Sequence, residues 1–165
     1  MTTDTSEKGL ESLIMRHLTG TDGLTVLPLA KRIAEAQATA YSAGIGYLAG
    51  SPKDYERAHA LDVPHLFAFL RATQPESFKK LGLADGPLDP NRLRFLTRIS
   101  SEIGSRGVID VLRSGVKHEQ LEFTLFYGTP SVGNATAAGL HAKNRFTITR
   151  QLAYSTDETR RSACH

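Results

Sequence analysis

The feature that most constrains the fold is a change in the hydrophobic period of the chain near residue 120. Up to Val116, apolar residues recur at spacings of three and four, which is the period of an amphipathic helix. From Leu121 onward, apolar and polar residues alternate, which is the period of a strand with one buried face. This change predicts an α+β fold, in which a helix-rich N-terminal half leads into an α/β-like C-terminal part.

Five segments before the change of period are predicted helices. The first has the clearest apolar stripe, and we expect that stripe to pack against the core. A helix over 28–41 is favoured mainly by the helix propensity of alanine. For the fourth helix, Asp89-Pro90 is a typical start. Apart from the helix over 28–41, the predicted helices have the following apolar stripes, in chain order: Leu10, Leu13, Ile14, His17 and Leu18; Leu66, Phe69 and Leu70; Leu93, Leu96, Ile99 and Ile103; and Val108, Val111, Leu112 and Val116.

Two strands with a short helix between them are predicted after the change of period. The alternating segments LEFTLF (121–126) and RFTITRQLAY (145–154) are the strands, and 135–143 is the helix. Glycine and proline predict loops at 44–52 and 84–91. Two strands leave unpaired edges, so a further strand is expected to follow. The polar STDETRRSACH follows instead, and we therefore expect residues 1–165 to form a single, truncated domain.

Composition excludes several classes of protein. The 165 residues are 40% hydrophobic and 22% charged, which is typical of one globular domain. No apolar run approaches the roughly 20 residues that a membrane span needs, so we expect a cytoplasmic protein without a membrane partner. The lone Cys164 excludes an internal disulfide framework. A net charge of +3 is compatible with nucleic-acid binding but does not require it.

Motifs of the best-known catalytic sites are absent from the sequence. It contains no GxxxxGK[ST], HExxH, CxxC or GxSxG pattern. No acids and lysine stand in the D...ExK arrangement that metal-dependent phosphodiester cleavage uses, and Glu122 reads as a solvent-facing strand residue. The histidines show no i, i+4 pair, so no metal site is predicted. They are His17, His59, His65, His118, His141 and His165.

Basic and amide side chains near the C-terminus are candidates for contacts with phosphates. Asn144, Arg145 and Arg150 are of the residue types that bind the DNA backbone. From charge alone, an ordinary solvated surface is about equally consistent with these residues. Gln151 is on the same predicted strand face as Thr147, where its amide could orient a phosphate or a water molecule. Plain strand polarity is the favoured interpretation of Gln151 from the residues alone.

Four blocks follow one another along the chain: SEKGLESLI, GIGYLAGSPKDYERAHALDVPHLFAFLRATQPE, RGVIDVLRSGVKHEQLEFTLFYGTPSVGNATAA and NRFTITRQLAYSTDETRR. In this order they resemble the N-terminal region of the R (restriction) subunit of type I restriction-modification enzymes. The succession is far more specific than any single block. Residues 19–43 match least.

The resemblance implies a PD-(D/E)xK-type restriction nuclease core, here incomplete, which an ATP-driven DNA-translocating motor follows in the whole subunit. Double-stranded DNA and the modification and specificity subunits are the implied partners. Mg²⁺ and ATP are implied for the full-length subunit, and no cofactor is predicted for this chain. Gln151 matches the family's glutamine before the catalytic strand, and Glu7 lies in the acidic motif of the first helix. Both are therefore implied to be auxiliary catalytic residues.

The family's catalytic aspartate and ExK pair follow the segment that resembles NRFTITRQLAYSTDETRR, so we expect them beyond His165. The predicted function is the N-terminal segment of a type I site-specific deoxyribonuclease, a metal-dependent DNA phosphodiester hydrolase, that does not cleave alone. The alternative is a noncatalytic module that docks to DNA or to the other subunits. A third possibility is an orphan domain without activity.

Overall fold

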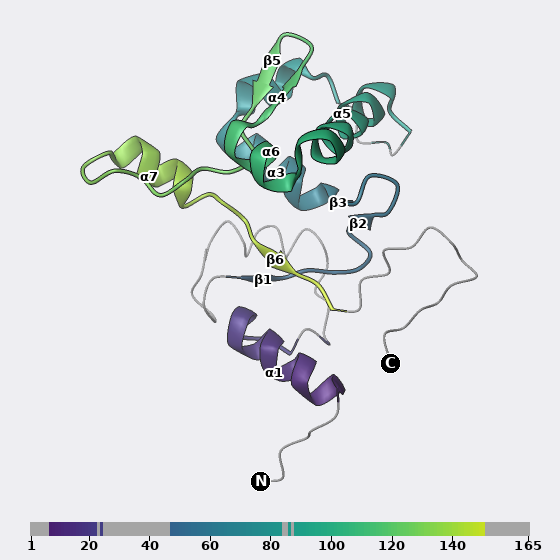
Figure 1. The fold of residues 1–165 in the computed structure, drawn as a ribbon, viewed down its shortest axis with the longest axis vertical. Coiled ribbons are helices and arrows are strands. Elements are labelled where there is room, and N and C mark those ends of the chain that lie inside the picture. The colour runs from purple at the N-terminus through teal and green to yellow at the C-terminus, as the bar shows by residue number, and fades with distance from the viewer. Residues whose placement is uncertain (1–6, 23, 25–46, 84–85, 87, 151–165) are drawn as a thin grey trace. The chain divides into compact units, whose positions relative to one another are not determined.

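The computed structural model describes residues 7–22, 24, 47–83, 86 and 88–150 (Figure 1). This part of the chain contains six helices and three two-stranded sheets, so the fold is mixed α+β and mostly helical, as the change of period predicted. Contacts divide the chain into two compact units. Unit 1 comprises residues 1–65 and 145–165, and unit 2 comprises residues 66–144. The expectation that residues 1–165 form a single domain stays a prediction.

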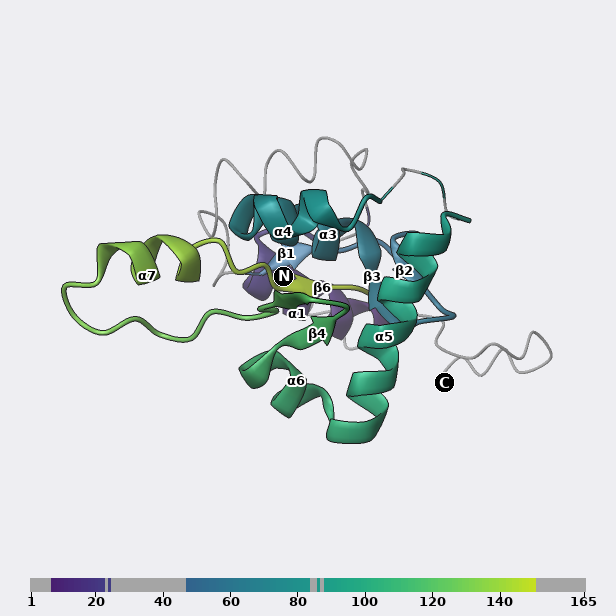
Figure 2. The same cartoon turned by 90° about the horizontal axis from the view of Figure 1, so that it is seen from above.

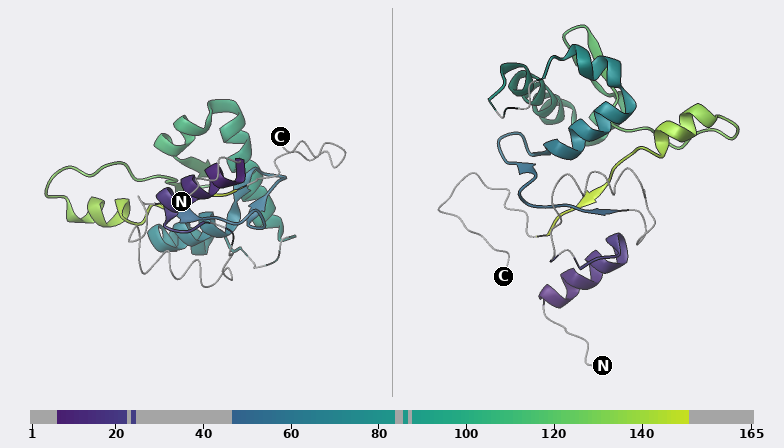
Figure 3. Two further views of the ribbon diagram at one scale, coloured as in Figure 1. Left: turned by 90° about the horizontal axis from the view of Figure 1, so that it is seen from below. Right: turned by 180° about the vertical axis from the view of Figure 1, so that it is seen from behind.

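Unit 1 brings together segments from the two ends of the sequence. Strand β1 (Leu48–Ala49) pairs in parallel with β6 (Thr147–Ile148), and helix α1 (Glu7–Thr19) contacts β1 (Figures 1 and 3). Strands β2 (Tyr55–Glu56) and β3 (Leu61–Asp62) form a short antiparallel hairpin. None of the helices in the described ranges is both long and apolar enough to cross a membrane.

Helix α1 forms where the sequence predicted it, but the predicted packing face is wrong. Leu10, Leu13 and Ile14 are 58%, 52% and 45% exposed. Met15 and Thr19, on another side of the helix, are buried instead. Periodicity shows that a helix has an apolar stripe, but the neighbouring strand decides which side is covered. Here the side that carries Met15 and Thr19 is the covered one.

The glycines at 44–52 were wrongly interpreted as marking a loop throughout, because this range contains β1. The amide of Gly50 donates to the carbonyl of Ile148 at 2.9 Å. A Cβ at Gly50 would collide with Oγ1 of Thr149, so glycine allows the two strands to approach closely. The strand predicted over 145–154 is assigned only at Thr147–Ile148, and its residues 151–154 lie outside the described ranges, as does the predicted helix 28–41.

Unit 2 is built from helices around one antiparallel hairpin (Figure 2). The hairpin contacts α4 and α5, and α6 packs beside α5. The short helix α7 lies at the far end of a long excursion of the chain, away from the other helices of this unit. The elements are α3 (Val63–Thr73, which begins at the end of unit 1), α4 (Pro75–Lys80), α5 (Pro90–Arg106), α6 (Val108–Ser114), β4 (Val116–His118), β5 (Leu121–Phe123) and α7 (Ala135–His141).

The core of unit 2 centres on α5, and here the sequence prediction is confirmed. Asp89 caps the helix by accepting the amide of Arg92 at 2.7 Å, and Pro90 opens it. Leu96 and Ile99, on the predicted stripe, are fully buried. Between them and the hairpin, the ring of Phe95 lies 4.9 Å from that of Phe123 in an edge-to-face arrangement.

Two predictions about the hairpin need correction. Val116 was placed on a helix, but α6 ends at Ser114 and Val116 begins β4. The strand predicted over 121–126 pairs with β4 only as far as Phe123. Beyond it, the side-chain amide of Gln74 takes the place of a partner strand, because it accepts from the amide of Thr124 at 2.9 Å and donates to its carbonyl at 2.8 Å. The two predicted strands therefore lie in different sheets, since β6 pairs with β1.

Replacing Gly115 with alanine is expected to destabilise unit 2. Gly115 has φ 71° and ψ −170°, a backbone region that only glycine adopts readily, and this strain alone costs about 1–3 kcal/mol. A Cβ there would also collide with the carbonyl oxygen of Phe123. Gly104→Ala is the matched control, because Gly104 lies within α5 with open space around it, and alanine there should stabilise by about 0.5–1 kcal/mol. Urea unfolding followed by circular dichroism checks both, and equal midpoints would contradict the prediction.

Candidate functional site

The described residues that were predicted to form a site are divided between the two units. Glu7 is exposed at the first position of α1. Arg145 is half-buried and belongs to unit 1 with Arg150, whereas Asn144 belongs to unit 2. Gln151 lies outside the described residues. The described residues among those predicted for the site thus belong to two units, and each is considered within its own unit.

Arg150 connects β6 to α1 within unit 1. Its Nη2 and Nε donate to Oε2 of Glu11 at 2.8 and 3.2 Å, and its Nη1 donates to Oγ of Ser12 at 3.2 Å and to the carbonyl of Asp22 at 2.9 Å. The Arg150 side chain is only 12% exposed, and that of Glu11 is 29% exposed. The guanidinium of Arg150 therefore joins the end of β6 to α1 and to the segment that follows α1, whereas its predicted contact with DNA stays a prediction.

Asn144 also has a structural role. It is buried, its Oδ1 accepts the amide of Tyr127 at 3.0 Å, and its Nδ2 donates to the carbonyl of Tyr127 at 2.7 Å. Nδ1 of His141 donates to the same carbonyl at 2.9 Å. These bonds join the two ends of the excursion that carries α7. Figure 3 shows the excursion projecting from the rest of unit 2. The side-chain amide that was predicted to contact DNA is therefore engaged inside unit 2.

A buried histidine, His65, pairs with the half-buried carboxylate of Asp62 beside the polar face of β6. Nδ1 of His65 donates to Oδ1 of Asp62 at 2.9 Å, and Thr147 donates to Oδ2 of the same carboxylate at 3.2 Å. The amide of His65 also points to Asp62, so the carboxylate caps the first turn of α3. His65 is only 5% exposed. The pair resembles the orienting half of a catalytic triad, but its bonds are accounted for by helix capping and by the attachment of β6.

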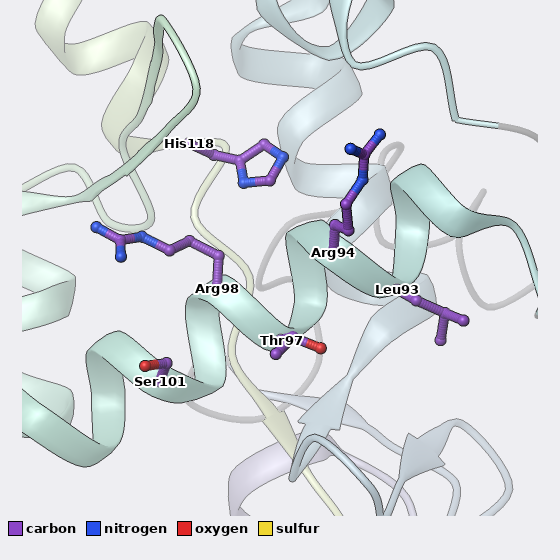
Figure 4. Close-up of a pocket in the computed structure, with 6 residues that line it drawn as sticks. All are labelled: Leu93, Arg94, Thr97, Arg98, Ser101 and His118. Atoms are coloured by element: carbon purple, nitrogen blue, oxygen red, sulfur yellow. The ribbon is translucent and has the colours of Figure 1, made fainter.

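A polar ridge on α5, which was not among the residues predicted for a site, borders an open hollow that is lined by residues of unit 2 (Figure 4). It is an open depression of about 470 Å³, with His118 of β4 on its other side. The signal was present in the sequence, because polar residues at i, i+3, i+4 and i+7 follow the face of α5 that is not buried. It was overlooked because only the apolar stripe was used to identify the helix. The lining residues are Leu93, Arg94, Thr97, Arg98, Ser101 and His118.

The two arginines of this ridge differ in their partners. Arg94 donates from Nη2 to Oδ1 of Asn91 at 2.6 Å, and the side chain of Asn91 is a neutral amide. Arg98 binds Glu102 at 2.6 Å through Nη2 and the carbonyl of Lys117 at 3.1 Å through Nε. Glu102 also binds Arg106 at 2.7 Å, so one carboxylate is shared between two guanidinium groups. Arg106 also binds Asp110 at 2.6 Å, so the charges of Arg98 and Arg106 are balanced by two carboxylates, and Arg94 supplies the remaining positive charge of the ridge.

Two exposed ion pairs near the ends of α5 and the hairpin shift the pKa of their members. The hydrogen bond from Arg106 lowers the pKa of the Asp110 carboxyl, and the hydrogen bonds to Glu102 and Asp110 raise the pKa of Arg106. The hydrogen bond to Glu122 raises the pKa of Lys117. Glu122 is 72% exposed, which confirms its predicted solvent-facing position. All three pKa shifts favour the charged forms of Asp110, Arg106 and Lys117, as expected for members of ion pairs.

No group of three or more His, Cys, Asp or Glu residues within the described ranges is arranged to hold a metal ion. The Mg²⁺ that the resemblance implies for the full-length subunit thus finds no ligand set among these residues.

Comparison of the chain with protein-family models, with curated proteins and with solved structures finds no match in any of the three. The assignment of a function therefore depends on the four sequence blocks and on the geometry of the two units.

Proposed function

We propose that this chain is the N-terminal segment of the R subunit of a type I restriction enzyme, and that it engages duplex DNA without cutting it alone. One observation carries the proposal. Arg150, in the block NRFTITRQLAYSTDETRR, binds Glu11 and Ser12, in the block SEKGLESLI. The first and the fourth of the four blocks are thus joined by a specific ion pair, although they lie at opposite ends of the sequence.

The second block supports the same proposal. GIGYLAGSPK contains β1, which pairs with β6 of the fourth block and contacts α1 of the first. Three of the four blocks therefore meet in unit 1. We propose that unit 1 is the scaffold of a PD-(D/E)xK-type core and that Gln151 and Glu7 are auxiliary to it.

Charge supports the engagement of DNA. Residues 66–144 contain ten Lys and Arg against seven Asp and Glu, so unit 2 holds the whole formal excess of the chain, which is +3. Long-range attraction to a polyanion comes from an excess of this kind. This distribution also agrees with the alternative that the chain is a noncatalytic DNA-docking module. DNA cleavage by the complete subunit would favour the nuclease segment over this alternative.

The proposal predicts binding without cleavage. The chain, titrated into a fluorescently labelled duplex, is expected to raise the anisotropy, with an affinity that falls as salt increases because counterions are released from phosphates. Supercoiled plasmid incubated with the chain and Mg²⁺ is expected to stay supercoiled on an agarose gel. Binding that is absent even at low salt, or nicking that EDTA abolishes, would contradict the proposal.

A further inference from the structure

We infer that the polar ridge of α5, formed by Arg94, Thr97, Arg98 and Ser101, binds the phosphate backbone of duplex DNA. The inference rests on the proposed function and specifies where unit 2 contacts its partner. It replaces Asn144 and Arg150, whose polar atoms are engaged within the protein. Figure 4 shows both guanidinium groups extending from α5 on the side where His118 lies.

The spacing of the ridge suits a polyanion. Arg94 and Arg98 are one helical turn apart, and Ser101 follows, so the ridge presents donors over about 10 Å of helix length. Arginine and hydroxyl side chains are the usual donors to phosphate oxygens, and such contacts position a protein on a duplex without reading its sequence. Arg94, Thr97, Arg98 and Ser101 are all exposed, so a large partner can reach them.

The charge that the ridge offers to a phosphate is that of Arg94. Glu102 is 13% exposed and is held between Arg98 and Arg106, and Arg106 also pairs with Asp110 at 2.6 Å, so these four charges balance. Glu119 lies 3.9 Å from Nε2 of His118 at the edge of the depression. In the described part of the chain, Arg94 forms no ion pair with a carboxylate. Because a guanidinium has five N–H donors, Arg94 can donate to a phosphate while it keeps its hydrogen bond to Asn91.

The shape of the hollow favours an extended partner over a small molecule. Sites for small ligands enclose most of the ligand and are lined mainly by apolar groups, with a few convergent polar groups. The depression beside α5 is open, so it would leave much of a small ligand exposed to solvent. A membrane surface is also disfavoured, because an amphipathic membrane-binding helix presents large apolar side chains to the lipid, and the apolar face of α5 is buried in unit 2.

The test compares two paired substitutions in the full chain. Arg94→Gln with Arg98→Gln removes two predicted phosphate contacts, and the slope of log K against log salt should fall in magnitude by about two. Affinity for the duplex at low salt should fall by at least tenfold. Lys79→Gln with Lys80→Gln, exposed on α4 of the same unit, removes the same charge elsewhere and should change the slope by much less. Circular dichroism spectra of both variants should match that of the unchanged chain.

The outcomes separate the inference from the proposed function. If the unchanged chain binds DNA and the two pairs of variants weaken binding equally, the ridge is not the contact and the inference is wrong, although the proposed function stands. If the unchanged chain does not bind DNA, both are wrong. Inorganic phosphate, compared with chloride at equal ionic strength, should not displace the duplex preferentially. Preferential displacement would identify a small-anion site and overturn the inference.

Discussion

Replacement of Phe95 by alanine is expected to destabilise unit 2 by about 3–5 kcal/mol, which is the range for removing a buried aromatic side chain. Phe95 is fully buried, and its ring contacts those of Phe123, His118 and Phe67 with centroids 4.9, 5.4 and 6.4 Å away. Alanine would leave a cavity between α5 and the β4–β5 hairpin. Because a domain of this size is stable by only about 5–15 kcal/mol, this one change removes a large share of the total.

Urea unfolding measures the loss, and hydrogen exchange locates it. We expect faster amide exchange in peptides from α5 and from the β4–β5 hairpin. Val132→Ala is the matched control, because Val132 is fully exposed in the excursion that carries α7, and truncation there should change the stability by less than about 0.5 kcal/mol. A Phe95→Ala protein that unfolds at the same urea concentration as the control would show that the packing around α5 is not as described.

Replacement of Arg150 by methionine is expected to destabilise unit 1 by about 2–4 kcal/mol, because removing one partner of a poorly exposed ion pair leaves the other charge unpaired. Methionine keeps most of the aliphatic volume, so the loss reports the guanidinium. Glu11 would lose two hydrogen bonds, and the carbonyl of Asp22 would lose one. The expected loss is below that of a deeply buried pair, since Glu11 retains 29% exposure.

Arg16→Met is the matched control for this prediction. Arg16 also lies on α1, and it pairs with Asp22 at 3.7 Å, but its side chain is 65% exposed, so its removal should cost less than about 1 kcal/mol. A double-mutant cycle with Glu11→Gln should show a coupling energy of about 0.5–3 kcal/mol between positions 11 and 150. Equal effects of Arg150→Met and Arg16→Met in urea unfolding would exclude the connecting role of Arg150. They would also remove the observation on which the proposed function rests.

The apolar periodicity of the sequence determined the elements whose signals are local. α5 is the clearest case, because a capping aspartate, a proline at the first turn and a stripe at helical spacing all agree. α1 and α7 likewise form within the predicted segments. In each of these helices, the hydrogen bonds and the caps join residues that are near in sequence, so the pattern of residues is sufficient.

Strand pairing was decided only by the tertiary structure. Nothing in the local pattern at Gly50 indicates a strand, because its role is to let β6 approach from the other end of the chain. The end of β5 is decided by the amide of Gln74, fifty positions away in sequence. A strand has no internal hydrogen bonds, so its extent depends on partners that the pattern cannot show.

The same distinction holds for the candidate site. The sequence by itself selected Asn144, Arg145 and Arg150 as residue types that bind phosphate, and its blocks suggested a family. Only the tertiary structure showed that Asn144 closes a loop and that Arg150 joins two distant segments, while Arg94 and Arg98 stay exposed on α5. A side chain carries the same hydrogen-bond donors wherever it lies in a protein. Whether they meet the protein or the solvent depends on which distant segments fold beside them.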